Sequence, residues 1–175
     1  MSRAFIGLGS NVNREANLAG ALVALRKRYG ALTVSRVYES EPIGFEGANF
    51  YNLVIGLETE TSPQALSKEL RQIESEHGRR RGNDKFIARA LDLDLLLFDD
   101  LIFRDRDIDV PRSDVTDYAF VLRPLSEIAG EQRHPETGEC YRNLWQEFEA
   151  SHKVRLWPVE EAIDRRSDES YGEVS

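Results

Sequence analysis

A strand with two aspartates inside an apolar run is the feature that most constrains the fold of this chain. Residues 90–98 read ALDLDLLLF, which is typical of a β-strand packed in a hydrophobic core. Alternate side chains of a strand point to opposite faces. The alternation places on one face Asp92, Asp94, Leu96 and Phe98, and on the opposite, core-facing side Leu91, Leu93, Leu95 and Leu97. The two carboxylates then lie about 7 Å apart, so their repulsion calls for a compensating positive charge.

Two interpretations of this aspartate pair are open. An edge strand whose aspartates face water would explain Asp92 and Asp94 without any function. Aspartate is depleted in strands, however, so two of them in an apolar strand favour a compensating cation. Mg²⁺ prefers oxygen ligands and is typically held by one or two carboxylates together with substrate phosphates. The sequence therefore predicts that Asp92 and Asp94 bind two Mg²⁺ ions in a phosphoryl-transfer site.

Basic residues gather just before this strand, in HGRRRGNDK (residues 77–85) and at Arg89. A solvated charge cluster after a helix C-terminus is the structural alternative. Guanidinium groups also form forked, charge-assisted bonds to phosphate oxygens, and Arg89 lies three residues before Asp92. The combination favours a phosphate site at the entrance of the strand, with Gly78 and Gly82 bounding a mobile flap.

Other residues are candidates for binding a flat heterocycle. Phe50 and Phe120 come from separate segments, and either belong to the core or enclose a planar ring between them. Asn52 shares a strand face with Phe50 and can hydrogen-bond the edge of such a ring. Glu74, near the end of a helix, is either an exposed helix residue or orients an arginine or a ribose. Structural roles are expected for GLGSN at the first strand's end, as a turn, and for His77, His134, His152 and Cys140, whose spacing fits neither a metal site nor a triad.

Composition limits the class of protein. The chain has 175 residues, a net charge of −8 and a single cysteine. The acidic balance argues against broad nucleic-acid binding, and the absence of a long apolar span or signal-peptide pattern argues against a membrane partner. We expect a cytoplasmic protein that works as a monomer on small molecules. One domain is expected over residues 1–158, followed by an acidic tail, 159–175, whose composition is typical of disorder.

The order of elements predicts an α+β fold. Strands are expected at 3–9, 31–39, 49–59 and 90–98. Helices are expected after Asn13, its N-cap, to about Arg28 and from Pro63 to Glu76, with Gly78 as the stop. This β-α-β-β-α-β order is that of a ferredoxin-like sandwich, a mainly antiparallel sheet with helices packed on it. A short hairpin is expected after the aspartate strand, with Pro124 breaking any single helix over 116–129, and a last helix near 143–150.

Together these segments resemble a known family. The run through GLGSN, YESEPIG, FYN, IESEHGRRR, RALDLDLLLF and FVLRPL resembles 6-hydroxymethyl-7,8-dihydropterin pyrophosphokinase, of folate biosynthesis, over residues 3–128. The GRxR followed by RxxDxD is its most specific part. The resemblance implies a ferredoxin-like fold and a Mg²⁺-dependent transfer of pyrophosphate from ATP, the co-substrate, to the hydroxymethyl oxygen of the pterin, with release of AMP.

The resemblance also implies roles for individual residues. It assigns the metal to Asp92 and Asp94, and catalysis to these two with Arg79 and Arg89. It assigns ATP binding to Glu74, Arg79, Arg81, Arg89, Leu95 and Arg112. It assigns pterin binding to Ser40, Glu41, Ile43, Phe50, Asn52 and Phe120.

The segment VPRSDVTDYAF departs from the family pattern. Arg112 stands where a nucleotide-binding histidine is expected, Tyr118 where an arginine is expected, and Ala88 replaces the proline before Arg89. A guanidinium can still bind phosphate but does not titrate near neutral pH as histidine does. The alternative function is therefore a diverged, non-catalytic pterin- or nucleotide-binding paralogue. A ferredoxin-like nucleic-acid module using GRRR is the third possibility, and the acidic balance weighs against it.

Overall fold

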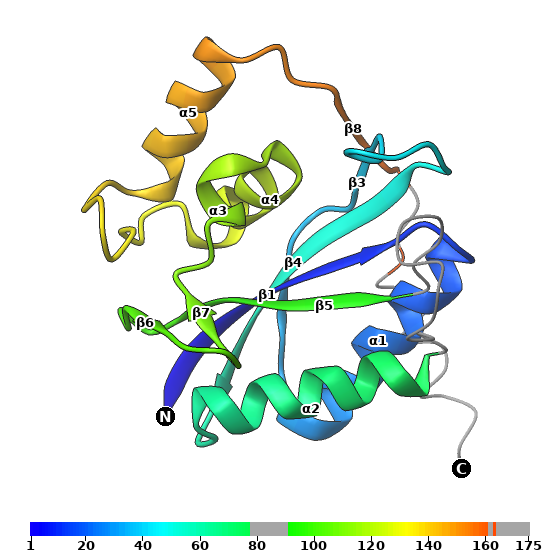
Figure 1. The fold of residues 1–175 in the computed structure, drawn as a ribbon, viewed down its shortest axis with the longest axis vertical. Coiled ribbons are helices and arrows are strands. Elements are labelled where there is room, and N and C mark those ends of the chain that lie inside the picture. Colours follow the sequence, from blue (N-terminus) through cyan, green and yellow to red (C-terminus); the bar gives the residue numbers. More distant parts are fainter. Residues whose placement is uncertain (78–90, 161–162, 164–175) are drawn as a thin grey trace.

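The computed structural model describes residues 1–77, 91–160 and 163 (Figure 1). Its elements in chain order are β1 (Ser2–Ser10), α1 (Arg14–Tyr29), β2 (Thr33–Val34), β3 (Tyr38–Ser40), β4 (Phe50–Thr59), α2 (Pro63–Glu76), β5 (Asp92–Phe98), β6 (Phe103–Arg104), β7 (Asp109–Val110), α3 (Asp114–Asp117), α4 (Ala119–Ala129), α5 (Tyr141–Ser151) and β8 (Leu156–Pro158). Among the described residues, no helix combines the length and the apolar character that crossing a membrane requires.

The main sheet is open and antiparallel. Its strands are ordered β5-β1-β4-β3-β8, and β2 pairs with β4 beside β3. Strands β6 and β7 form a separate hairpin, as the sequence predicts. The predicted α+β architecture with a mainly antiparallel sheet is therefore confirmed.

Helices cover both faces of the sheet and divide the core in two (Figure 1). On one face the strands pack against α1 and α2, through a cluster that includes Leu8, Leu22, Ile55, Leu70 and Leu93. On the other face they pack against α4, through a second cluster that includes Phe5, Val54, Leu96, Leu122 and Leu125. Each face of the sheet is apolar where it meets these helices.

The alternation predicted for the aspartate strand holds only as far as Leu96. Leu95 pairs with Ile6 of β1, but Leu97 pairs with Phe5, so Leu96 is an extra residue in the pairing. Such a bulge exchanges the faces of the residues after it. Phe98 therefore packs in the α1–α2 cluster and Leu97 in the α4 cluster, the reverse of the expectation. Asp92 and Asp94 precede the bulge and keep the predicted shared face.

The break within 116–129 is not at Pro124. Pro124 lies inside α4, whereas the chain leaves helical geometry at Tyr118, with φ −125° and ψ 128°. The extended backbone at Tyr118 separates the short α3 from α4, so the break precedes the proline by six residues. The start of α4, which contains Phe120, follows directly after this change in backbone direction.

The predicted strand 31–39 is divided. β2 and β3 are separated by residues 35–37, and the Ser35 hydroxyl accepts a hydrogen bond from the backbone N–H of Val54 at 2.9 Å. Both short strands still pair with β4, so a serine side chain replaces one backbone partner without changing the topology.

The starts of the first two helices are as predicted, with one difference in capping. Pro63 is the first residue of α2, and the Ser62 hydroxyl accepts from the Ala65 N–H at 3.2 Å. Asn13 precedes α1 as expected, but it is left-handed, with φ 44°, and its side chain makes no cap. The expected helix stop at Gly78 lies outside the described residues; α2 ends at Glu76, with His77 as its C-cap.

The division at residue 158 stays a prediction. Most of the acidic tail, 159–175, lies outside the described residues. Of the described part, Val159 donates its N–H to the Val37 carbonyl at 2.9 Å and packs against the core, and Ile163 is buried.

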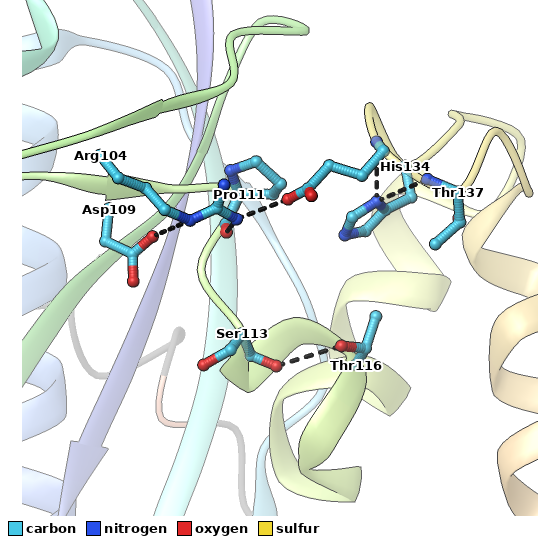
Figure 2. A network of polar contacts seen from close by, with 8 residues as sticks. Arg104, Asp109, Pro111, Ser113, Thr116, His134 and Thr137 are labelled. Carbon is cyan, nitrogen blue, oxygen red and sulfur yellow. Dashed lines mark hydrogen bonds and ion pairs between the residues drawn. The ribbon is translucent and has the colours of Figure 1, made fainter.

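A polar network ties the β6–β7 hairpin to the turn after α4 (Figure 2). Arg104 binds Asp109 at 2.9 Å and Glu136 at 2.5 Å. In that turn, His134 Nδ1 accepts hydrogen bonds from the N–H groups of Glu136 and Thr137, at 3.1 and 3.3 Å. Both bonds need an unprotonated Nδ1, which agrees with the structural role expected for His134.

We expect the His134 turn to weaken in acid. Burial lowers the pKa of His134 below its usual value. The unfolded chain then binds the proton more readily, so this contribution to stability is present above about pH 6.5 and is lost as the pH falls through the folded pKa. His134→Asn keeps a side-chain acceptor without the titration. Thermal unfolding from pH 8 to 5 should show the wild type losing more stability than this variant; parallel profiles would contradict the assignment.

Candidate active site

A cavity of about 240 Å³ opens on the sheet face that carries the two aspartates. Its floor is formed by β1, β4 and β5, and its walls by the segment 40–45 and by α3 and the start of α4. The residues that line it are Gly7, Leu8, Gly9, Ser40, Glu41, Ile43, Phe45, Phe50, Asn52, Leu53, Val54, Asp92, Asp94, Leu96, Asp114, Tyr118, Phe120 and Val121. Eight of the predicted site residues therefore meet in one place.

Strand register sets the distance between Asp92 and Asn52 on the cavity floor. Gly9 of β1 pairs with Asp92 on one side and with Asn52 on the other. Residues directly opposite each other in an antiparallel pair point to the same face, so Asp92, Gly9 and Asn52 form a row across the cavity floor. Two strand spacings separate the carboxylate from the amide, which is about 10 Å.

The cross-strand neighbours of both aspartates are glycines. Gly7 pairs with Asp94 as Gly9 pairs with Asp92. A Cβ on Gly9 would lie 3.4 Å from Asn52 Oδ1 and 3.9 Å from the Phe50 ring, and one on Gly7 would lie 3.5 Å from Leu96. Glycine thus leaves the floor open between the carboxylates and the amide. The expectation that GLGSN merely shapes a turn is wrong, because Gly7 and Gly9 lie within β1 and line the cavity.

The donors at this end of the cavity fit a hard divalent cation. Asp92 and Asp94 offer carboxylate oxygens on one face beside open space. In the described part of the chain, no group of three or more histidine, cysteine or acidic side chains could hold a metal. Two protein carboxylates, with water and substrate oxygens completing the shell, is the manner in which Mg²⁺ is usually bound.

Arg112 supplies the positive charge closest to the pair among the described ion pairs. Its Nη1 lies 3.8 Å from Asp94 Oδ1, and its Nε donates to Asp114 Oδ2 at 3.0 Å. Protein surrounds the Asp94 carboxyl even though 41% of the side chain is exposed. This desolvation raises the pKa of Asp94 to about 6; the Arg112 charge opposes the shift and the Asp92 charge adds to it. A cation at this point would favour the ionised form.

Glu74 is not an exposed helix residue. Its side chain is buried, and its Oε1 accepts the N–H of Leu93 at 2.7 Å. Leu93 lies between the two aspartates on β5, the edge strand of the sheet. Glu74 therefore secures the strand that carries the aspartates, which the alternatives from the sequence did not include.

The other end of the cavity is aromatic and amide-lined. Asn52 is buried, and its Nδ2 donates to the Ser40 hydroxyl at 2.8 Å. The Phe50 ring meets Phe45 edge to face at 6.2 Å, and Phe120 stacks with Tyr118 at 5.0 Å. Ring faces and a fixed amide are what recognition of a planar heterocycle requires.

Some predicted site residues are not brought to the cavity. Arg79, Arg81 and Arg89, with the flap predicted around them, lie outside the described residues. Leu95 packs in the α1–α2 cluster, on the sheet face opposite the aspartates. Arg112 reaches the cavity through Asp94 and Asp114 rather than by lining it.

Besides the glycines and the aliphatic core residues, three side chains that line the cavity were not predicted as site residues from the sequence. Phe45 lies between Gly44 and Gly47, where an aromatic side chain in a glycine-rich loop was a usable signal. Asp114 and Tyr118 were read only as part of a divergent segment. Their place in the cavity depends on the kink at Tyr118, which the sequence does not indicate.

Known proteins are similar in sequence to most of this chain. The family described as 7,8-dihydro-6-hydroxymethylpterin-pyrophosphokinase (HPPK) matches residues 5–130. A 2-amino-4-hydroxy-6-hydroxymethyldihydropteridine pyrophosphokinase from Haemophilus influenzae is 36% identical, over 88% of this chain and 97% of that protein. One of the same name from Bacillus subtilis is 32% identical, over 92% and 93%.

Solved structures share the fold. A Plasmodium falciparum HPPK-DHPS crystal structure superposes with a TM-score of 0.66 at 16% identity, over 84% of this chain. The match spans 43% of that longer chain. The family match over residues 5–130 and the near full-length bacterial relatives decide the assignment: this chain belongs to the HPPK family.

Proposed function

We propose that this chain transfers the pyrophosphoryl group of ATP to the hydroxymethyl oxygen of 6-hydroxymethyl-7,8-dihydropterin, with Mg²⁺ required and AMP released. Membership of the HPPK family supports a pyrophosphokinase of folate biosynthesis with ATP as co-substrate. The observation that carries the finer statement is the row Asp92–Gly9–Asn52. In this row, the carboxylate proposed to hold the metal and the amide proposed to bind the heterocycle lie on one cavity floor, about two strand spacings apart.

The pterin would occupy the aromatic end of the cavity. Phe50 and Phe120 would enclose its faces from two elements, while Asn52 and Ser40 would read its polar edge. Glu41 and Ile43 line the same end and would complete the wall. With the ring bound there, the hydroxymethyl group would point toward the aspartates.

The triphosphate would lie at the aspartate end. Asp92 and Asp94 would hold Mg²⁺, which when bound neutralises phosphate charge and acidifies a coordinated hydroxyl. Arg112 lies beside Asp94, and Arg79, Arg81 and Arg89 are predicted to add further contacts to phosphate.

The reaction itself needs positioning more than covalent help from the protein. The hydroxymethyl oxygen forms a bond to the β-phosphorus of ATP. The bond from that phosphorus to the bridging oxygen of the α-phosphate breaks, AMP leaves with the bridging oxygen, and the hydroxyl proton passes to solvent. The protein's part is to hold the two reactants in line and exclude water.

Arg112→Ala is expected to raise the KM for ATP about tenfold, because charge-assisted bonds to phosphate are worth about 1.5–3 kcal/mol. Arg112→His, which restores the residue expected from the family pattern, should stay within about threefold of the wild type. Steady-state kinetics at saturating pterin measure both values. An unchanged KM for ATP in Arg112→Ala would remove Arg112 from the nucleotide site.

The test of the proposed function is product analysis. The protein is incubated with ATP, Mg²⁺ and the hydroxymethyl pterin, with a chelator-treated sample as control. Stoichiometric AMP and pyrophosphorylated pterin, lost on chelation, support the proposal. Release of ADP instead of AMP would point to transfer of a single phosphoryl group and overturn it.

One observation favours a second candidate, a diverged binding protein. Tyr118 stacks on Phe120 where the family pattern has an arginine, which enlarges the aromatic wall and removes a phosphate contact. Calorimetry that shows binding of the pterin with no AMP formed would select this candidate.

A further inference from the structure

The chain after the family match returns to the active site. The match ends at residue 130, yet α5 and β8 follow. β8 adds a strand to the sheet beside β3, with Leu156 opposite Ser40 and Trp157 opposite Glu39. In Figure 1 the segment after α5 crosses back from the α4 side to the β3 edge. The C-terminal part of the chain therefore abuts the strand that leads into the cavity wall.

Arg155, just before β8, forms hydrogen bonds to that wall. Its Nε donates to Glu41 Oε1 at 2.8 Å, and its Nη2 donates to the same oxygen. Its guanidinium also lies over the Trp157 ring, 5.5 Å from the centroid. Glu41 is the first residue after β3 and lines the cavity next to Ser40. The contact thus joins two segments 114 positions apart at the mouth of the site.

The wall segment 41–49 is also anchored by Phe45, whose ring packs edge to face on Phe50, and by the Asn49 amide, which donates to Glu39 at 3.0 Å. Its far end is held by Asn11, which donates to the Ala48 carbonyl at 3.4 Å, and by Arg14, which donates to the Asn49 carbonyl at 3.1 Å. Between the two ends, Ile43 is 58% exposed and Gly44 has a φ of 82°. Arg155 is the side chain that holds the near end.

The Glu41–Arg155 ion pair also affects the net charge of the cavity. The cavity already contains Asp92, Asp94 and Asp114. A Glu41 carboxylate released from Arg155 would be a fourth negative charge near a site that must accept a triphosphate. Held by Arg155, it is neutralised and kept in place.

We propose that Arg155 is a positioning residue for the pterin wall: the Glu41–Arg155 clamp sets the conformation of segment 41–49. This inference rests on the proposed function for its kinetic consequence and on the structure alone for its conformational one. Because the pair is exposed, at 59% and 47%, its effect is that of a surface ion pair, about a three- to fivefold change in affinity.

The kinetic test compares Arg155→Ala with Arg142→Ala. Arg142 is a matched control: it is 57% exposed, binds Glu131, and lies on α5. Arg155→Ala is expected to raise the KM for the pterin about three- to fivefold with kcat and the KM for ATP nearly unchanged, and Arg142→Ala to change none of them. The difference from wild type should disappear above about 0.5 M salt, where the pair is screened.

A second measurement separates failure of the clamp from failure of the function. Hydrogen exchange of segment 41–49 should be faster in Arg155→Ala than in the wild type or in Arg142→Ala, with no substrate present. If the wild type makes no AMP but this exchange difference is found, the clamp stands and the pyrophosphokinase proposal fails. If AMP is made and neither the exchange nor the pterin KM responds to Arg155→Ala, the clamp is overturned.

Discussion

Asp94→Asn is expected to lower kcat at least about 10³-fold while leaving the chain folded. A metal ion stabilises transition-state charge by several kcal/mol, and about 4 kcal/mol corresponds to 10³ in rate. Asparagine has nearly the shape of aspartate but no charge to hold Mg²⁺. The raised pKa of Asp94 means that the ionised form is disfavoured when no cation is bound. Loss of charge should therefore leave thermal stability unchanged or higher.

The matched control is Asp100→Asn. Asp100 is exposed and lies two residues after the end of β5, so it tests the effect of losing a carboxylate near the same strand. AMP formation under saturating substrates gives kcat, and thermal unfolding gives stability. If Asp94→Asn keeps more than a tenth of the wild-type kcat, the assignment of Asp94 to the metal is wrong, whatever the control shows.

Asn52→Ala is expected to raise the KM for the pterin about 10- to 100-fold. The amide is buried and held by Ser40, so a heterocycle bound against it would lose a preorganised partner. An unpaired polar group in a dry site costs about 1–3 kcal/mol, which is the size of the expected change. The KM for ATP should stay within about threefold, because the aspartates are two strand spacings away.

Asn49→Ala is the matched control for this change. Asn49 donates to Glu39 at 3.0 Å and does not line the cavity. Pterin affinity measured by calorimetry with a non-hydrolysable ATP analogue checks the kinetic value. Equal losses in the two variants would show that the effect is a general weakening of this part of the sheet.

The sequence was sufficient for the fold class and for the main elements as far as β5, because apolar periodicity and helix starts are local signals; β8 was not predicted. Pro63 at the start of α2 and the alternation up to Asp94 are of this kind. The exchange of Leu97 and Phe98 was not predictable, because the bulge that causes it arises from how β5 pairs with β1.

The same distinction between local signals and long-range contacts applies to the candidate site. The face shared by Asp92 and Asp94 follows from strand geometry within one segment. The buried bond of Glu74 to Leu93, the place of Tyr118 and the grip of Arg155 on Glu41 join distant segments. Such contacts depend on the packing of one element against another, which residue spacing does not encode.

The glycines opposite the aspartates have a consequence for inhibitors. Strand β1 is hydrogen-bonded on both sides, so the bare backbone at Gly7 and Gly9 cannot move without breaking the sheet. A compound that lies flat on this stretch touches main-chain atoms, which no point mutation removes. An alanine at Gly7 or Gly9 would meet Leu96 or Asn52 at ordinary contact distance, but its methyl group would cover the cavity floor for the substrate as well as for the compound. Drug resistance should therefore arise in the surrounding side chains and spare this strand.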